Sequence, residues 1–221
     1  MKQSFTVLIL LVLFAISFAA DIKTDPLCWH DKLALKCGPG KVIHIIDTYY
    51  GTNPQQSCPG YTTGNCYSNT STAAVQFRCE GANACAFAIE PVEIGGDPCY
   101  QRNKDFTVTY RCIESPGTLA ETIRACVNET LEIACGPDAL ISVASAFYGR
   151  SDSTTCPSTS STVNGVCLSG TALNTIKSKC DGKGKCSIRS SPAVLGNPCS
   201  SATEYLILKY YCVVKPDNCS L

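Results

Sequence analysis

Apolar and polar residues follow the same order twice along this chain, and each pass predicts a short set of strands. Residues 131–135 alternate between apolar and polar, as a half-buried strand does, and 33–37 repeat the alternation more loosely. Longer runs of β-branched and aromatic residues follow at 42–50 and 140–148, and a glycine ends each of them. These runs predict two further strands, one in each pass.

The spacing of apolar residues then changes to that of a helix. Segments 68–78 and 169–179 begin with Ser, Thr and Asn, end shortly before a glycine, and place apolar side chains four residues apart, which predicts an amphipathic helix in each. Last strands are predicted over 106–112 and 205–212. Because strands and helices are mixed without regular alternation, the pattern predicts an α+β fold with a small antiparallel sheet in each pass.

Sixteen of the 17 cysteines repeat in the same order. The first octet is Cys28, Cys37, Cys58, Cys66, Cys79, Cys85, Cys99 and Cys112, and the second is Cys126, Cys135, Cys156, Cys167, Cys180, Cys186, Cys199 and Cys212. Five of the seven gaps between neighbouring cysteines are identical in the two octets, and the other two differ by lengths that loops usually absorb. The chain is therefore two copies of one module. Domains are expected at 21–114 and 119–214, followed by a tail at 215–221 that holds the remaining Cys219.

The cysteines are expected to form disulfides. A zinc site would need closely spaced ligand pairs, and the sequence contains no Cys-x-x-Cys. A module of this size buries only roughly 60% of its unfolded-chain surface, so four disulfides, at roughly 2–4 kcal/mol each, would supply much of its stability. Eight cysteines allow more than a hundred pairings, and spacing suggests only the fifth with the sixth, because turn-forming residues separate them in both copies.

The first residues and the sequons point to export. Residues 1–20 combine an early lysine, an apolar run and small residues at the end, which is typical of a secretory signal peptide. Sequons at Asn69, Asn128 and Asn218 are acceptors for N-glycans. No later segment is apolar for long enough to span a membrane, and an oxidising compartment suits the disulfides. We expect a secreted, extracellular glycoprotein without a membrane span.

Charge and motifs argue against several classes of function. The chain has 18 basic and 18 acidic residues and no basic cluster, so a nucleic-acid partner is not expected. The two histidines, His30 and His44, lack counterparts in the second copy, and no nucleophile elbow, metal-ligand cluster or phosphate loop is present. We expect no catalysis, no metal and no cofactor. Cys219 is either a mobile tail residue or a thiol that is capped or forms a disulfide-linked dimer.

Two short motifs recur outside the cysteines. Tyr-Gly-Thr at 50–52 matches Tyr-Gly-Arg at 148–150, and Gly-Asp-Pro-Cys at 96–99 matches Gly-Asn-Pro-Cys at 196–199. A structural role alone would explain them, since the glycine permits a tight turn after a strand and Asp or Asn before proline accepts hydrogen bonds in its own turn.

With the cysteine spacing, these motifs resemble the rhamnose-binding lectins of the sea-urchin-egg-lectin (SUEL) type, also called galactose-binding lectin domains. The resemblance covers nearly all of the chain after residue 20 and implies two tandem α+β domains, each with a five-stranded antiparallel sheet and short helices. It implies the disulfides Cys28–Cys58, Cys37–Cys112, Cys66–Cys99 and Cys79–Cys85 in the first domain, and Cys126–Cys156, Cys135–Cys212, Cys167–Cys199 and Cys180–Cys186 in the second.

The resemblance also implies a calcium-independent pocket for L-rhamnose or D-galactose. The family pocket uses a Glu after the first cysteine, the Tyr of Tyr-Gly-Arg, the Asp of Asp-Pro-Cys and a Lys shortly after it. In the first domain Tyr50, Asp97 and Lys104 match, as stacking surface, hydroxyl acceptor and donor. Trp29 replaces the glutamate and Thr52 the arginine. Trp29 is either a stacking platform for a sugar or, as is more common for a lone tryptophan beside a disulfide, a core residue.

The second domain keeps less of the pocket. Tyr148 and Arg150 match, and Asn197 occupies the aspartate position. Val127 replaces the glutamate and Glu204 the lysine. Each lost acceptor for a buried hydroxyl costs roughly 1–3 kcal/mol of affinity, so the first domain is expected to be the main carbohydrate site.

Two functions follow from this comparison of residues. The first is a secreted, non-catalytic, carbohydrate-binding lectin for cell-surface or microbial glycans. The second is a protein-binding or adhesion module that retains the scaffold without the sugar, which resembles the use of this domain in latrophilin-type receptors. Competition by free sugar distinguishes them, because only the first predicts inhibition by a monosaccharide.

Overall fold

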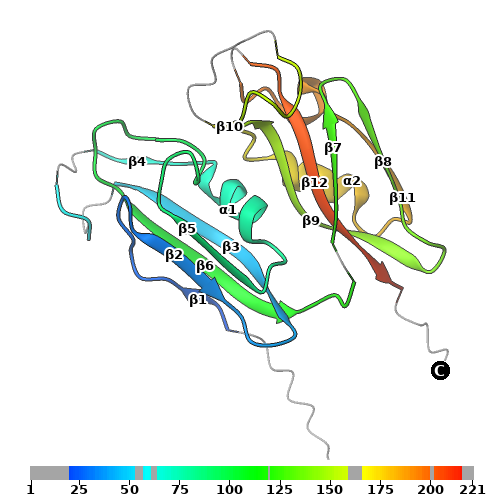
Figure 1. Cartoon of the computed structure of the whole chain (residues 1–221), viewed down its shortest axis with the longest axis horizontal. Helices are drawn as coiled ribbons and strands as arrows, with labels where there is room; N and C mark the ends of the chain where they lie inside the picture. Colours follow the sequence, from blue (N-terminus) through cyan, green and yellow to red (C-terminus); the bar gives the residue numbers. More distant parts are fainter. Residues whose placement is uncertain are drawn as a thin grey trace, which may run out of the picture.

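The computed structural model describes residues 20–52, 57–60, 64–118, 120–158, 166–199 and 202–215. The expected signal peptide, apart from Ala20, lies outside these residues, as do the Asn218 sequon and Cys219. Figure 1 shows two sheet-rich domains side by side.

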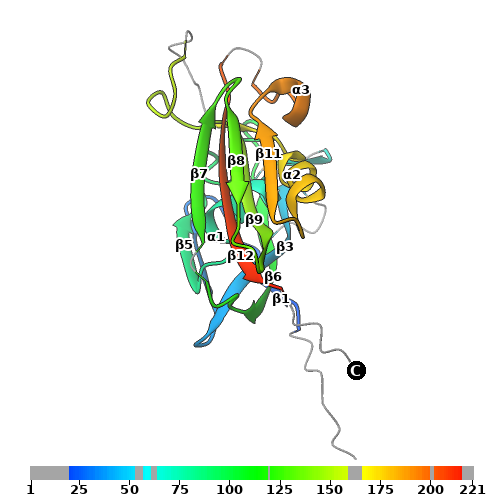
Figure 2. The same ribbon diagram turned by 90° about the vertical axis from the view of Figure 1, so that its right-hand side faces the viewer.

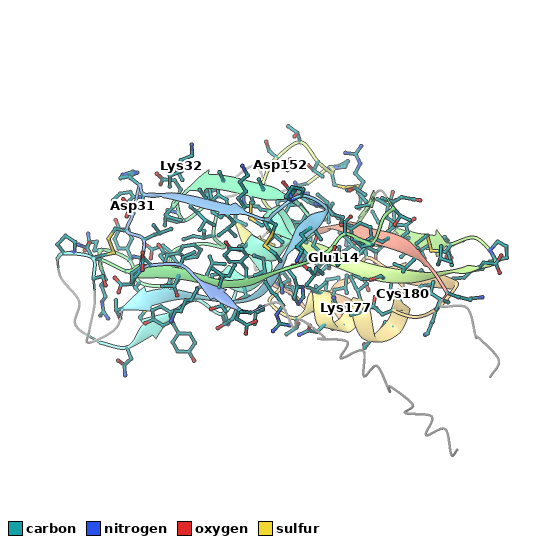
Figure 3. All side chains as sticks on the ribbon, turned by 90° about the horizontal axis from the view of Figure 1, so that it is seen from below. Asp31, Lys32, Glu114, Asp152, Lys177 and Cys180 are labelled. Carbon is teal, nitrogen blue, oxygen red and sulfur yellow. A yellow bond between two sulfur atoms is a disulfide. The ribbon has the colours of Figure 1, made fainter. Side chains whose placement is uncertain are left out.

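The described part of domain 1 has two antiparallel sheets and one helix. Its elements are β1 Ile22–Lys23, β2 Lys32–Lys36, β3 Lys41–Thr52, β4 Cys66–Tyr67, α1 Ser71–Cys79, β5 Ala84–Ala88 and β6 Asp105–Glu114. The larger sheet has the order β1-β6-β3-β4, and β2 pairs with β5 in the smaller one. Figure 3 places Glu114, at the end of β6, near the passage from domain 1 to domain 2.

Domain 2 repeats this arrangement. Its elements are β7 Glu121–Cys126, β8 Thr130–Ala134, β9 Ala139–Arg150, β10 Cys167–Leu168, α2 Ala172–Cys180, β11 Lys185–Arg189, the short α3 Pro192–Leu195, and β12 Tyr205–Val214. The strand orders are β10-β9-β12-β7 and β11-β8. In Figure 2, where domain 2 faces the viewer, the β8–β11 pair lies between β7 and α2.

The fold class is confirmed, while the strands of each domain are divided between two sheets instead of forming one. In β2, Leu33 and Leu35 are buried and the alternate residues are exposed. Such a strand can cover the core as a second layer. The helices begin at Ser71 and Ala172, three residues later than the pattern predicts, because the hydroxyls of Ser68 and Ser169 accept the first backbone N–H groups.

Eight disulfides pair the cysteines as the resemblance implies. Each joins two cysteines of one domain. Cys79–Cys85 and Cys180–Cys186 close the turn between the helix and the following strand. Cys37–Cys112 and Cys135–Cys212 connect the smaller sheet to the last strand of the larger one. The bridges therefore connect the layers that enclose each core.

The domains contact each other through α1, which packs on β3 of its own domain and on β9 of domain 2 (Figure 1). Ala73 and Ala74 are buried against this second face, and the ring centroid of Phe77 lies 5.1 Å from that of Phe147. Phe147 also lies 5.4 Å from the ring of Tyr205. The sheet of domain 2 is thus covered on both faces, by its own α2 and by the helix of domain 1.

Candidate functional site

A pocket of about 500 Å³ opens in domain 1 where the end of β3, the turn after β1 and the loop before β6 meet. The three residues expected to bind sugar, Tyr50, Asp97 and Lys104, all line it, and so does Trp29. The Cys28–Cys58 disulfide contributes both of its cysteines to the wall. The volume lies in the range that small ligands fill.

The carboxylate of Asp97 is held by the turn it belongs to. Its Oδ1 accepts the backbone N–H of Cys99 at 2.8 Å and the ammonium of Lys104 at 2.8 Å. Among the described residues, no hydrogen bond is made by Oδ2, and the side chain is 29% exposed. Oδ2 is therefore an acceptor that the pocket can offer to a ligand hydroxyl.

Lys104 is fully engaged by the protein. Besides Asp97, its Nζ donates to the carbonyls of Cys99 at 2.8 Å and Arg102 at 2.6 Å, which uses all three N–H bonds. Its side chain is only 9% exposed. In this geometry Lys104 orients the carboxylate, and a bond from Lys104 to a sugar would require one of the three to break.

Tyr50 forms a buried wall of the pocket. Its ring packs edge-on against Phe106, with centroids 6.1 Å apart, and lies 5.8 Å from the ammonium of Lys104. Burial, and then the negative charges of Asp97 and Glu90, raise the pKa of the Tyr50 hydroxyl well above its ordinary value. The group therefore stays protonated and can donate a hydrogen bond at every physiological pH.

Trp29 is an exposed platform, so the expectation of a core position for it is wrong. The residue is 64% exposed. Its Nε1 donates to Glu90 Oε2 at 2.8 Å, and its ring stacks on His30 at 4.3 Å. Nδ1 of His30 lies 2.6 Å from Glu90 Oε1. The hydrogen bond from Trp29, and then the one from His30, hold the pKa of Glu90 below its ordinary value. The sequence does not indicate that Glu90 holds Trp29 at the surface, because the two residues are 61 positions apart.

In domain 2, the arginine of the Tyr-Gly-Arg motif is part of the interior. Arg150 is fully buried. Its guanidinium donates to the carbonyls of Thr203, Asp152 and Cys156 and lies 5.3 Å from the ring of Tyr205. These contacts make Arg150 a structural residue with no N–H group exposed to a ligand, in contrast to the sugar contact that the motif suggests.

The other two domain 2 positions carry the opposite hydrogen-bonding polarity to their domain 1 counterparts. With its amide oriented to satisfy its neighbours, Asn197 donates to Glu204 Oε1 at 2.7 Å and to the carbonyl of Cys199 at 3.2 Å. A donor thus replaces the Asp97 acceptor, and an acceptor replaces the Lys104 donor. Tyr148 is fully buried, and its hydroxyl has no partner among the described residues. Val127, at the position of the family glutamate, is half-buried.

Other expectations can be placed on the structure as well. Asn69 and Asn128 are both exposed, as N-glycan acceptors must be. Within the described residues, no group of three or more His, Cys, Asp or Glu side chains is arranged to hold a metal ion. In the same part of the chain, no helix is long and apolar enough to cross a membrane.

The chain is similar to known lectins over most of its length. The family model of the D-galactoside/L-rhamnose binding SUEL lectin domain matches residues 35–112 and 133–212. An L-rhamnose-binding lectin (CSL1) of Oncorhynchus keta is 31% identical over 81% of this chain and 62% of its own length. A rhamnose-binding lectin of Silurus asotus is 30% identical over 85% of this chain and 60% of its own length. This chain therefore spans about three fifths of those two relatives. The protein eva-1 homolog C of Mus musculus is 27% identical over 85% of this chain and 44% of its own length.

Proposed function

Because this chain belongs to the D-galactoside/L-rhamnose binding SUEL lectin family, we propose that it is a secreted, non-catalytic lectin that binds L-rhamnose- or D-galactose-type glycans through the pocket of domain 1. The observation that carries the proposal is the meeting of Trp29, Tyr50, Asp97 and Lys104 in that pocket. The many disulfides support an extracellular location, since such bonds persist in oxidising compartments.

The pocket offers the groups that sugar recognition needs. A pyranose presents hydroxyls that both donate and accept, next to faces of C–H groups. The free Oδ2 of Asp97 accepts from a hydroxyl in a charge-assisted bond, the protonated Tyr50 donates to one, and the exposed ring of Trp29 covers an apolar face. The Lys104 ammonium fixes the carboxylate before the ligand arrives, which reduces the ordering cost of binding.

Calcium independence is part of the proposal. The charge of Asp97 is balanced by Lys104 at 2.8 Å, so the carboxylate does not need a cation to be stable in the pocket. Binding measured in EDTA should therefore equal binding measured in millimolar calcium. Loss of binding in EDTA would overturn this part of the proposal.

A protein-binding role remains the second candidate, and domain 2 favours it. There, two of the residues that match the domain 1 pocket are already paired: Arg150 with three carbonyls and Asn197 with Glu204, while the buried hydroxyl of Tyr148 has no partner among the described residues. Polar groups that are already paired, or buried as Tyr148 is, have little to offer to a monosaccharide. Domain 2 would then contribute a surface for a protein partner while domain 1 binds the glycan.

The test is a glycan array with the purified mature protein, competed by free L-rhamnose and D-galactose. The key variant is Asp97→Asn, because Asn197 shows that this turn accepts asparagine. The matched control is Asn197→Ala in domain 2. Sugar-inhibited binding that Asp97→Asn removes and Asn197→Ala retains would support the lectin. A folded protein that binds no glycan, or binding that Asp97→Asn does not weaken, would refute it.

A further inference from the structure

The pocket of domain 1 continues into a second pocket across Asp97. The second pocket has a volume of about 850 Å³ and shares Pro91 and Asp97 with the first. Its other walls come from residues 67–70, which run from the end of β4 to the start of α1, from the loop 92–98, and from Val166 of domain 2. One carboxylate thus borders two adjoining hollows, one within domain 1 and one at the junction of the domains.

Exposed apolar side chains gather around these two pockets. Seven large hydrophobic residues are exposed in the described part of the chain, and four of them line one pocket or the other. Trp29 and Tyr100, 64% and 81% exposed, border the first pocket. Tyr67 and Val92, 70% and 47% exposed, border the second. Exposed apolar side chains that cluster in this way mark a binding surface.

The chemistry of the second pocket suits a neutral, hydroxyl-rich chain. Its polar lining comes from the hydroxyls of Ser68 and Thr70, which hydrogen-bond to each other, and from the amide of Asn69, and Asp97 is its one charged side chain among the described residues. Without a lysine, arginine or histidine in that lining, the pocket has no group to pair with a sulfate, phosphate or carboxylate. The cation beside Asp97, Lys104, already donates all three of its N–H bonds within the protein, so it is not available to pair with an acidic ligand.

The walls of the second pocket are fixed in place. The Cys66–Cys99 disulfide ties β4 to the loop that carries Asp97. Thr70 Oγ1 donates to the carbonyl of Gly95 at 2.9 Å, and a Cβ on Gly95 would lie 2.9 Å from that same Oγ1. Gly95 also has a φ of +92°, a conformation that favours glycine. The pocket is therefore present before a ligand arrives, as ligand sites usually are.

We propose that the two pockets form one groove for a neutral oligosaccharide. The terminal sugar occupies the first pocket, the chain passes over Asp97, and the next sugars lie in the second pocket with Tyr67 as their stacking surface. This inference rests on the proposed function, because the first pocket must hold the terminal sugar. It adds that the ligand is longer than one sugar and reaches the junction of the domains.

The test compares ligands of different length by calorimetry. The protein carries Asn69→Gln throughout, so that an attached glycan cannot fill the second pocket. The ligands are free L-rhamnose or D-galactose and neutral oligosaccharides of two to four units that end in the same sugar. We expect the oligosaccharides to bind more tightly than the monosaccharide. Tyr67→Ala should weaken their binding by about 2- to 10-fold and leave the monosaccharide unchanged.

Tyr67→Phe is the matched control. It keeps the ring, so it should retain the higher affinity for oligosaccharides than for the monosaccharide. Tyr67 is well exposed, so neither variant threatens the fold. Affinity that does not rise with length, or oligosaccharide binding that Tyr67→Ala leaves unchanged, would overturn the groove. If one of these two results is found while the monosaccharide still binds and Asp97→Asn abolishes that binding, only the groove is refuted and the lectin function stands. If no sugar binds at all, both the groove and the proposed lectin function fail.

Discussion

Exchanging the polar pair of domain 1 for that of domain 2 should cost less stability than the single substitutions predict together, and it should abolish sugar binding. Asp97 and Lys104 form an ion pair at 2.8 Å, whereas Asn197 donates to Glu204 at 2.7 Å at the matching positions. The perturbation is the double substitution Asp97→Asn with Lys104→Glu, compared with each single substitution. If the two pairs are structural equivalents, each single change breaks a pair and the double change builds the other one.

The magnitudes follow from what each change leaves unpaired. Asp97→Asn removes the charge that faces the Lys104 ammonium, and with a side chain 29% exposed this should cost about 1–2 kcal/mol. Lys104→Glu places two carboxylates together and leaves two backbone carbonyls without a donor, which should cost about 2–4 kcal/mol. In the double variant an amide–carboxylate bond returns, so the total loss should be about 1–2 kcal/mol, a coupling of roughly 2–4 kcal/mol.

Trp29 provides the assay. It is the single tryptophan of the chain and lines the pocket, so its emission follows both the unfolding of domain 1 by guanidinium and the binding of sugar. All three variants should lose sugar binding, because none keeps the Asp97 carboxylate and its Lys104 partner together. The reciprocal exchange in domain 2, Asn197→Asp with Glu204→Lys, is the control and should leave sugar binding unchanged.

Two results would refute this reasoning. A double variant whose loss of stability equals the sum of the single losses, within about 0.5 kcal/mol, would show that the two pairs are not equivalent. A double variant that still binds sugar at the original affinity would show that the Asp97 carboxylate is not the acceptor.

Three further predictions concern other residues. Arg150→Met should lower the free energy of unfolding of domain 2 by about 3–5 kcal/mol, since three interior carbonyls lose their donor; an unchanged denaturation midpoint by circular dichroism would contradict it. Burial and the hydrogen bond to Glu121 raise the pKa of Tyr210 to about 12. The protonated hydroxyl therefore contributes stability in full below about pH 10, and this is lost as the pH rises towards 12. Tyr210→Phe should flatten alkaline unfolding in that window, and a curve identical to the parent's would count against it. Trp29→Ala should weaken sugar binding by about 2- to 10-fold in calorimetry, whereas Trp29→Phe should retain most of it; equal affinities for both would argue against stacking.

Much of the fold could be predicted from the sequence because it is recorded locally. The alternation in 33–37, the apolar run in 42–50 and the four-residue spacing in 68–78 each describe one element, and the repeated cysteine spacing identifies the module. The turn at Asp97 could also be predicted, since the aspartate precedes proline and accepts the N–H of Cys99 two residues later.

The remainder depends on contacts between distant residues. Trp29 is exposed because Glu90 and His30 hold its ring on the surface, and nothing next to Trp29 indicates Glu90 as its partner. The changes at Asn197 and Glu204, taken one at a time, look like losses, and only their 2.7 Å contact shows a pair with reversed polarity. Phe147 faces the helix of the other domain, so its burial could not be assigned from its own module.

The arrangement of the disulfides determines what a protease could do to this protein. Cys37–Cys112 and Cys135–Cys212 each close a covalent loop, spanning 75 and 77 positions of sequence. A single cut of the backbone inside either loop leaves the two fragments joined by the disulfide. A cleaved domain can therefore refold as one covalent unit. A cut between Cys112 and Cys126 crosses no disulfide, because each of the eight bridges lies within one domain. After such a cut, only non-covalent contacts would keep the halves associated, chiefly the packing of α1 on β9 and the hydrogen bond from Tyr211 to the carbonyl of Gly81, and dilution would favour their separation.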